Sequence, residues 1–334
     1  MGEHDTLFKR VFSVPEYAAA ELASVLPRTL VSAVDLSQLV LVNGSFVDET
    51  MQHRHADLLF RAPRRRSRSR GARKGRRRGG QAKMVYFYFL FEHLSRTDAL
   101  AAFRLLQYME RIWAQLLRED PTLETLPLIV PLVVHHGAGG WRGPRSLHEM
   151  IEGVDEFPAL RPFVPNLELL IDDLALHTDG ELQQRPMPPV PKLATWLLRD
   201  GRDVRELLRH VPAWGADLEH VARAQPGELV ALLGYILLVA GVESLQAVRD
   251  TIVLHAPSTE ASMISIADHL IEQGRELGDL NALRRVLRLQ LTSRFGPLSA
   301  EFETRLNAAD SERLELAVSR VLTAAHPADV LPSD

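Results

Sequence analysis

The sequence contains no cysteine, no apolar signal core near its start and no long apolar run. The absence of cysteine excludes disulfide bonds and thiolate metal sites, and it fits a reducing compartment. The opening stretch, MGEHDTLFKR, is polar, so we expect no export and a cytoplasmic protein. The longest apolar run, residues 229–240, is interrupted by Gly234 and is shorter than the roughly 20 residues of a membrane helix. We therefore predict a buried core helix there and no membrane partner.

Internal repeats, a P-loop, a nucleophile elbow and the ligand spacing of a zinc site are also missing. What is present is ordinary for a soluble globular protein, with 46% hydrophobic and 25% charged residues. A chain of 334 residues is long enough for one large domain or two medium ones.

Acidic residues are missing from residues 61–83, which hold ten arginines and two lysines. The net charge is −4, so the remainder of the chain carries −16. Because this stretch combines like charges with no apolar periodicity, we predict a disordered insert over 62–83. It would supply most of the long-range attraction to DNA, or it is a solvated expansion without a function. The candidate DNA-contacting residues in it are Arg64, Arg65, Arg66, Arg68, Arg70, Arg73, Arg76, Arg77 and Arg78.

Two apolar runs flank this insert, Leu58–Phe60 and Met84–Phe91, and each has a carboxylate at its polar end. Asp57 precedes the first run and Glu92 follows the second. If the runs pair as a hairpin, both carboxylates come to the same edge of a sheet. Two neighbouring carboxylates repel each other unless a divalent cation shares them, and oxygen ligands of this kind suit Mg²⁺ or Mn²⁺. The pattern therefore indicates a metal site able to cleave phosphodiester bonds.

A second metal site competes for the same carboxylate. His53, His55 and Asp57 alternate, so an extended chain places all three on one face. They would form a His/His/Asp transition-metal site, or the histidines are polar residues that flank the carboxylate.

Seven ordered motifs carry a family resemblance: HDTLFKRVFSVPEYAAAEL (4–22), VDLSQL (34–39), GSFVDE (44–49), HADLLF (55–60), FEHLS (91–95), AFRLLQYM (102–109) and LPLIVPLVVHHG (126–137). Together they resemble the recombination-promoting nuclease (Rpn) family, whose catalytic domain belongs to the PD-(D/E)XK nuclease superfamily. SIADHLIEQGRELG (265–278) and RFGPLSAEFETRLNAAD (294–310) resemble the helical end of the same proteins.

The resemblance implies an α/β fold: a PD-(D/E)XK restriction-endonuclease-like core, with a mixed sheet flanked by helices, and a mostly α-helical C-terminal region. We expect the core at residues 1–140, a helical extension at 141–260 and a C-terminal helical region at 261–334. The implied activity is metal-dependent endonuclease cleavage of DNA, associated with recombination.

The family pattern assigns the metal to Asp57 and Glu92. Superfamily members often add an acidic residue from the first core helix, for which Glu16 and Glu21 are the candidates here. Two positions after the glutamate, the superfamily usually has a lysine that orients the attacking water, and the Rpn family has a glutamine.

This sequence has Leu94 at that position, on the same strand face as Glu92. Leucine neither donates nor accepts a hydrogen bond, so the role is vacant unless a neighbour fills it. Gln107 or Arg104, on the following helix, are the candidates, and Arg104 is also a candidate phosphate contact. The alternative is a catalytically degenerate nuclease that binds DNA or other proteins without cleaving DNA.

Periodicity predicts the remaining elements: helices at 5–10, 14–26 and 99–117, strands at 39–42 and 128–134, and proline-broken helices over 145–260. His135 and His136 follow the second strand, where the family match resembles a Tyr-His-Gly turn, so we expect His136 to support the site at most. Asp172 and Asp173 are predicted to be solvated or helix-capping. Residues 262–322 are predicted to be helical, with a leucine face suited to docking or to a homo-oligomer.

Overall fold

The computed structural model describes residues 2–42, 58–65, 86–321, 324 and 326–332. The chain divides into two compact units, Met1–Ser262 and Met263–Asp334. The predictions for His53, His55 and Asp57, and those for the arginines from Arg66 to Arg78, lie outside the described residues.

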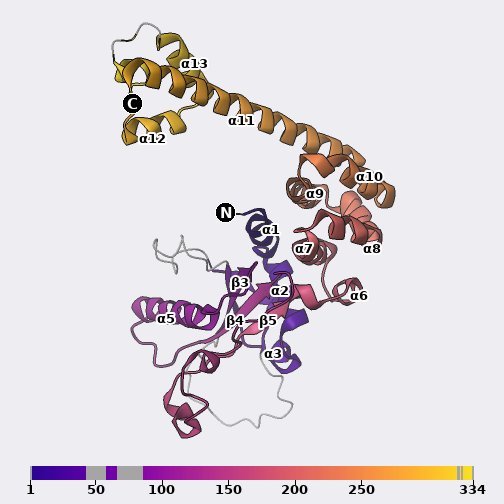
Figure 1. Cartoon of the computed structure of the whole chain (residues 1–334). Coiled ribbons are helices and arrows are strands. Elements are labelled where there is room, and N and C mark those ends of the chain that lie inside the picture. Colours follow the sequence, from indigo (N-terminus) through magenta and orange to yellow (C-terminus); the bar gives the residue numbers. More distant parts are fainter. Residues whose placement is uncertain (1, 43–57, 66–85, 322–323, 325, 333–334) are drawn as a thin grey trace. The chain divides into compact units, whose positions relative to one another are not determined.

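A five-stranded mixed sheet lies within the first unit, in the order β1-β2-β3-β4-β5 (Figure 1). The strands are β1 (Val40–Leu41), β2 (Leu58–Pro63), β3 (Tyr86–Leu94), β4 (Leu128–His135) and β5 (Leu170–Asp173). The pairs β1·β2 and β2·β3 are antiparallel, whereas the pairs β3·β4 and β4·β5 are parallel. The predicted hairpin is confirmed, with Leu58 opposite Phe91. The central place of β3 agrees with its almost entirely apolar sequence.

Two parts of the sheet differ from the prediction. β2 extends to Pro63, Ala62 is fully buried, and the Arg65 amide donates to the Ala33 carbonyl at 2.7 Å. The disorder predicted from residue 62 is therefore wrong for residues 62–65, because backbone pairing outweighs the local charge. β5 was not predicted, since its four residues end in two aspartates, a composition typical of a loop.

Helices cover both faces of the sheet (Figure 1). On one face lie α1 (Glu3–Phe12) and α2 (Pro15–Val25), and the Phe8 ring of α1 stacks on His93 of β3 at 4.8 Å. On the other face, α5 (Ala101–Glu119) buries Leu105 and Tyr108 against Leu59, Ile129 and Val133 of the sheet.

The helix predicted at 99–117 is confirmed as α5, which begins at Ala101 and ends at Glu119. The apolar residues Leu100 and Phe103 do not face the core, since they are 61% and 46% exposed. Ala101, Ala102 and Leu105 occupy the contact with the sheet instead, because small residues allow the helix to approach it closely.

The rest of the first unit is mostly helical, as predicted for 145–260. Its α-helices are α3 (Arg28–Ala33), α6 (Asp179–Gln183), α7 (Pro189–Asp200), α8 (Val204–Ala224), α9 (Pro226–Ala240) and α10 (Leu245–His255). Its 3₁₀ turns are η1 (Leu36–Gln38), η2 (His148–Met150), η3 (Pro158–Phe163), η4 (Leu174–Leu176), η5 (Val242–Ser244) and η6 (Pro257–Thr259). Proline opens α7 and α9, where its missing amide costs no hydrogen bond. The predicted buried helix at 229–240 is α9, with Leu232 and Ile236 fully buried.

The second unit has a small core of its own. Leu287 and Leu291 of α11 (Glu260–Phe295) pack with residues of α12 (Ala300–Ala308) and α13 (Ser311–Arg320), and α14 (Pro327–Val330) adds Val330. Ser299 and Asp310 cap α12 and α13 by accepting backbone amides. In the part of the chain that the structure describes, no helix combines the length and apolarity needed to cross a membrane.

Candidate functional site

The start of β2 and the carboxyl ends of β3 and β4 meet at one end of the sheet. Leu58, the first described residue of β2, is opposite Phe91, and the β3 residue after Phe91 is Glu92. The backbone of Glu92 pairs with Val133 of β4. Asp57 precedes Leu58 in the chain but lies outside the described residues, as does the side chain of Glu92.

Leu94 ends β3 as part of the apolar core. Its side chain is partly buried and packs against the cluster that joins α5 to the sheet. Its strand partner is His135, the last residue of β4. No polar group therefore occurs at position 94, in agreement with the sequence.

His135 forms a buried pair with Asp173, its neighbour at the end of β5. The His135 Nδ1 and Asp173 Oδ1 atoms are 2.9 Å apart, and the two side chains are 1% and 6% exposed. The second carboxylate oxygen accepts the Trp141 amide at 2.5 Å. The prediction that Asp173 is solvated or helix-capping is wrong, because its carboxylate has two buried donors in place of water.

A second group of histidines lies on the opposite face of the sheet. His93 stacks between Phe8 and His136, with ring centroids 4.8 and 4.6 Å apart, and Arg202 Nε donates to His136 Nδ1 at 3.4 Å. Burial lowers the pKa of His93 to about 3. Burial, helped by the closeness of His93 and by the charge of Arg202, lowers the pKa of His136 to about 2. Both rings are therefore neutral at physiological pH, and the supporting role of His136 stays a prediction.

The two glutamates proposed from the first core helix differ in environment. Glu16 is exposed in the first turn of α2, whereas Glu21 is fully buried. Arg185 forks onto Asp172 with two bonds of 2.7 Å and reaches Glu21 at 3.3 Å. Arg185 thus contacts one oxygen of Glu21, and the role of this glutamate as a ligand stays a prediction.

The pKa values of the same carboxyls move in opposite directions. Burial raises the pKa of Glu21 well above its usual value, and the charge of Asp172 adds to the effect. Burial alone would raise the pKa of Asp172 as well, but hydrogen bonds from His177 and Arg185 outweigh it and hold that pKa well below its usual range. Asp172 is 3% exposed, so the prediction of a solvated or helix-capping residue is wrong for it too.

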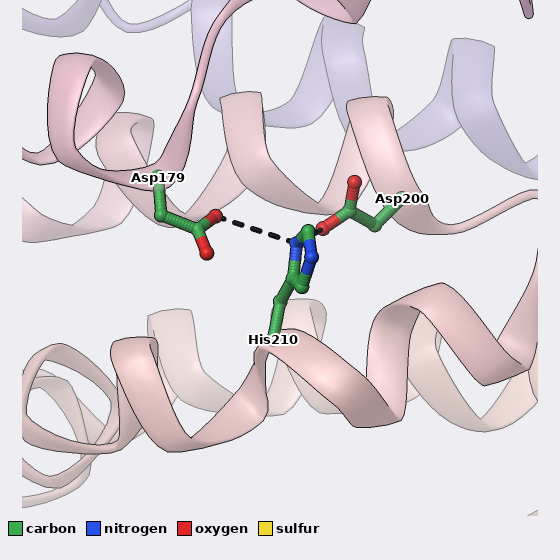
Figure 2. A group of neighbouring side chains, drawn as sticks. All are labelled: Asp179, Asp200 and His210. Carbon is green, nitrogen blue, oxygen red and sulfur yellow. Dashed lines mark hydrogen bonds and ion pairs between the residues drawn. The ribbon is translucent and has the colours of Figure 1, made fainter.

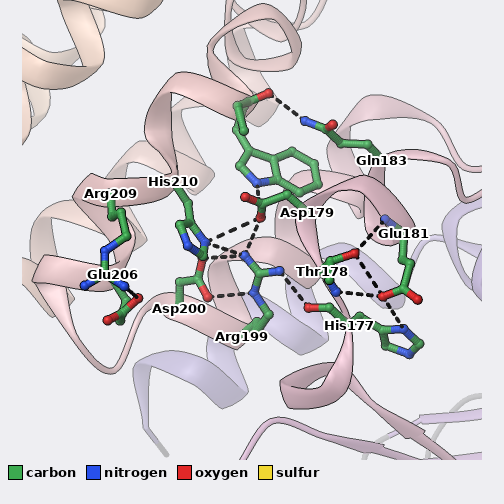
Figure 3. Close-up of polar contacts among 12 residues, drawn as sticks. His177, Thr178, Asp179, Glu181, Gln183, Arg199, Asp200, Glu206, Arg209 and His210 are labelled. Atoms are coloured by element: carbon green, nitrogen blue, oxygen red, sulfur yellow. Dashed lines mark hydrogen bonds and ion pairs between the residues drawn. The ribbon is translucent and has the colours of Figure 1, made fainter.

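One group among the described residues has the spacing of a cation site. Asp179, Asp200 and His210 bring three ligand atoms within 4.8 Å of one another (Figure 2). The Arg199 guanidinium lies among them, 2.6 and 2.7 Å from the two Asp200 oxygens and 2.7 Å from His210 Nδ1 (Figure 3). We name these four residues the Arg199 cluster. The guanidinium already bonds both carboxylates and the histidine nitrogen, so the ligand atoms are occupied by a cation of the chain and the group does not fit a metal ion.

The candidate DNA contacts within the described residues differ in exposure. Arg64 and Arg65 are exposed just after β2. Arg104 is half-buried and ion-paired with Asp98, and Gln107 is exposed on α5. The predicted roles of these residues stay predictions.

Sequence reasoning missed the pairing of His135 with Asp173. The histidine was visible as the end of a strand, but the aspartate belongs to a strand whose four residues give too weak a pattern to be recognised. The signal that could have found the pair is the parallel order of β4 and β5, which only the fold provides.

Comparisons with known proteins agree with the resemblance. Residues 2–223 match the family described as "Putative transposase, YhgA-like". The chain is 27% identical over 267 residues to recombination-promoting nuclease RpnD of Escherichia coli O157:H7, an alignment that covers 80% of this chain and 93% of that protein. It is 26% identical over 284 residues to recombination-promoting nuclease RpnA of Escherichia coli K12, covering 85% and 88%.

A third relative carries a different label. The chain is 25% identical over 275 residues to the "inactive recombination-promoting nuclease-like protein RpnE" of Escherichia coli K12, covering 82% of this chain and 83% of that protein. No solved structure matches the chain. Since the family match spans well over half of the sequence, this chain belongs to the YhgA-like transposase family, whose relatives include the recombination-promoting nucleases.

Proposed function

We propose that this protein is a metal-dependent DNA endonuclease with a PD-(D/E)XK-type core. The observation that carries the proposal is the register of β2 and β3. Leu58, the residue after Asp57 in the sequence, is opposite Phe91, so β2 begins at the end of the sheet where Glu92 lies. A mixed sheet flanked by helices is the architecture expected for this core, and it supports the proposal. The relatives named as nucleases support the same activity.

Asp57 and Glu92 hold the metal in this proposal, and Glu16 is the further candidate on α2. Bound Mg²⁺ or Mn²⁺ supplies Lewis-acid stabilisation of the phosphate charge. The carboxylates fix its position and orient the substrate phosphate towards the attacking water. DNA is the proposed substrate, and the catalytic core is proposed to occupy residues 1–140.

Plasmid nicking with Mg²⁺ or Mn²⁺ tests the proposal. Wild type is expected to convert supercoiled DNA to the nicked form, and Asp57→Ala is expected to abolish conversion. Glu110→Ala, which removes an exposed carboxylate from α5, is the matched control and should cleave like wild type. Equal cleavage by wild type and Asp57→Ala would contradict the proposal that Asp57 holds the metal.

A second candidate function is DNA binding without cleavage. Leu94 favours it, because its side chain belongs to an apolar cluster, and one relative is named inactive. The nicking assay separates the two functions. If wild type does not cleave DNA but Leu94→Gln does, the protein is a nuclease inactivated by the residue at position 94.

The arginine-rich insert is the proposed DNA-attracting element. Deleting residues 66–82, which carry eight positive charges, preserves the whole of β2. If all eight charges contact phosphates, the slope of log Kobs against log salt becomes shallower by about 7. An unchanged slope would show that the insert makes no phosphate contacts.

A further inference from the structure

Two arginines from different parts of the chain lie beside the carboxyl ends of β3 and β4. Arg96 follows shortly after Leu94, the last residue of β3, and Arg202 belongs to the turn between α7 and α8. His136, the residue after β4, joins the two regions. Its amide donates to the Leu94 carbonyl at 3.1 Å, and its Nδ1 accepts a hydrogen bond from Arg202 Nε at 3.4 Å. Ligands of α/β sheets bind outside the carboxyl ends of the parallel strands, which is where these side chains meet.

The charge of Arg96 acts on Arg202. Burial lowers the pKa of Arg202 from its usual value, and the neighbouring charge of Arg96 lowers it further. Arginine stays protonated at physiological pH in spite of such a shift. Both residues are exposed, so solvent and ligands can reach them. The two guanidiniums are therefore a pair of accessible positive charges that repel each other unless an anion is shared between them.

The carboxylates nearest to these arginines in the sequence bind other groups. Asp98 is ion-paired with Arg104, and it accepts the Leu100 amide at 2.7 Å. Asp203 accepts the Arg205 amide at 2.8 Å, at the start of α8. Among the residues that the structure describes, neither guanidinium of the pair has a carboxylate within ion-pairing distance. Their charge is thus not neutralised by the described part of the chain.

His136 holds Arg202 in place without adding a charge. Its Nδ1 accepts the hydrogen bond from Arg202, so the ring proton lies on Nε2 and the ring is neutral. His4 packs edge-on against the same ring, with centroids 4.9 Å apart, and its own Nδ1 lies 2.6 Å from the Tyr235 hydroxyl. The Nη groups of Arg202 bond to no residue that the structure describes. A guanidinium held through Nε can still present its Nη groups to an anion.

We propose that Arg96 and Arg202 together bind one phosphate group of DNA at the carboxyl ends of β3 and β4. Guanidiniums bind phosphate oxygens through charge-assisted and often bidentate hydrogen bonds, and phosphates receive most of the contacts that proteins make with DNA. The identity of the anion as a DNA phosphate rests on the proposed function. The competing explanation is that Arg202 only satisfies His136 and that Arg96 is a solvated surface charge.

Fluorescence anisotropy of a labelled duplex in metal-free buffer measures binding without cleavage. Arg96→Gln and Arg202→Gln should each weaken binding roughly tenfold, because each removes charge-assisted bonds to the phosphate. Arg223→Gln is the matched control, since it removes the same charge from an exposed arginine that is already paired with Glu219, and it should bind like wild type. Tryptophan fluorescence in urea checks that each variant is folded.

The double variant Arg96→Gln/Arg202→Gln tests whether one phosphate is shared. If both arginines hold the same phosphate, the combined loss should fall well short of the roughly hundredfold product of the single losses. The slope of log Kobs against log salt should become shallower by about 1, the value for one phosphate, and not by about 2. Losses that multiply, with a slope change near 2, would overturn the shared site.

Duplexes with phosphorylated and unphosphorylated ends identify which phosphate is bound. An equal loss of affinity on both duplexes would assign the site to an internal phosphodiester, and a loss only on the phosphorylated duplex would assign it to a DNA end. Either result supports the inference. Unchanged affinity of both single variants on both duplexes would overturn it.

Failure of this inference differs from failure of the proposed function. Unchanged DNA affinity in both arginine variants, with wild-type nicking that Asp57→Ala abolishes, would overturn the phosphate site and leave the endonuclease standing. Binding that depends on both arginines in a wild type that nicks no DNA with either metal would overturn the endonuclease. The phosphate site would then belong to a protein that binds DNA without cleaving it.

Discussion

Removing the guanidinium of Arg185 should leave two carboxylates buried together without a cation. Arg185→Ala takes away both 2.7 Å bonds to Asp172 and the contact to Glu21. The three side chains are between 1% and 9% exposed, so water cannot replace the lost charge. Breaking a buried ion pair from one side typically costs 3–5 kcal/mol. We expect a loss of about 4 kcal/mol in the free energy of unfolding at pH 7.

The loss should shrink on acidification. In wild type the pKa of Asp172 is depressed, so its contribution is present above its unfolded pKa and is lost only as the pH falls through the folded value. In the variant, His177 remains hydrogen-bonded to Asp172, but the guanidinium no longer opposes protonation, and one proton shared by Asp172 and Glu21 relieves their repulsion. The difference between variant and wild type should therefore be clearly smaller at pH 5 than at pH 7.

Urea unfolding followed by tryptophan fluorescence measures this difference. All four tryptophans lie at positions 113, 141, 196 and 214, within the first unit, so the signal reports on the unit that contains Arg185. Glu21→Gln is the control, because it replaces the buried carboxyl by an amide of the same shape and leaves Arg185 on Asp172, and it should change stability by less than about 1 kcal/mol. A loss below 1 kcal/mol for Arg185→Ala, or an equal loss at both pH values, would refute the reasoning.

Two further outcomes follow from other groups. Burial lowers the pKa of His93 to about 3 and of His136 to about 2. Below pH 6.5, these two histidines therefore bind protons in the unfolded chain but stay neutral in the folded chain. The free energy of unfolding should be highest above pH 6.5 and should fall by up to about 1.4 kcal/mol per histidine per pH unit below it. His93→Phe should flatten the pH dependence of the urea midpoint. An unaltered pH dependence in this variant would contradict the prediction. For the Arg199 cluster, millimolar Mn²⁺ or Zn²⁺ should not raise the melting temperature of Asp57→Ala. Adding Arg199→Ala should create a metal-dependent rise, and an equal rise without that change would show that Arg199 does not fill the site.

The sequence predicted the elements whose patterns are long. The apolar run that became β3, the periodic helix α5 and the proline-started helices were all recognisable from spacing alone. The sequence-based prediction failed where contacts with distant residues determine the structure. Arg64 and Arg65 were predicted to belong to a disordered charged insert, but backbone pairing with Val34 and Ala33 orders them. Asp172 and Asp173 were predicted to be solvated or helix-capping, because no local pattern reveals their distant partners, Arg185 and His135. The sequence showed that position 94 lacks a polar group, but it did not show that His135 is the strand partner of Leu94.

The junction between β2 and β3 has a consequence for how this chain can be altered. Pro63 is opposite Tyr86, so the intervening 22 residues close a loop whose two ends are already held together by the sheet. The entropy of closing such a loop grows only with the logarithm of its length, about 0.6 kcal/mol for each doubling. Shortening it to five residues should therefore change stability by only about 1 kcal/mol. An element of almost any length or composition can be exchanged at this point by genetic insertion, deletion or circular permutation, while the paired strands on either side keep their register.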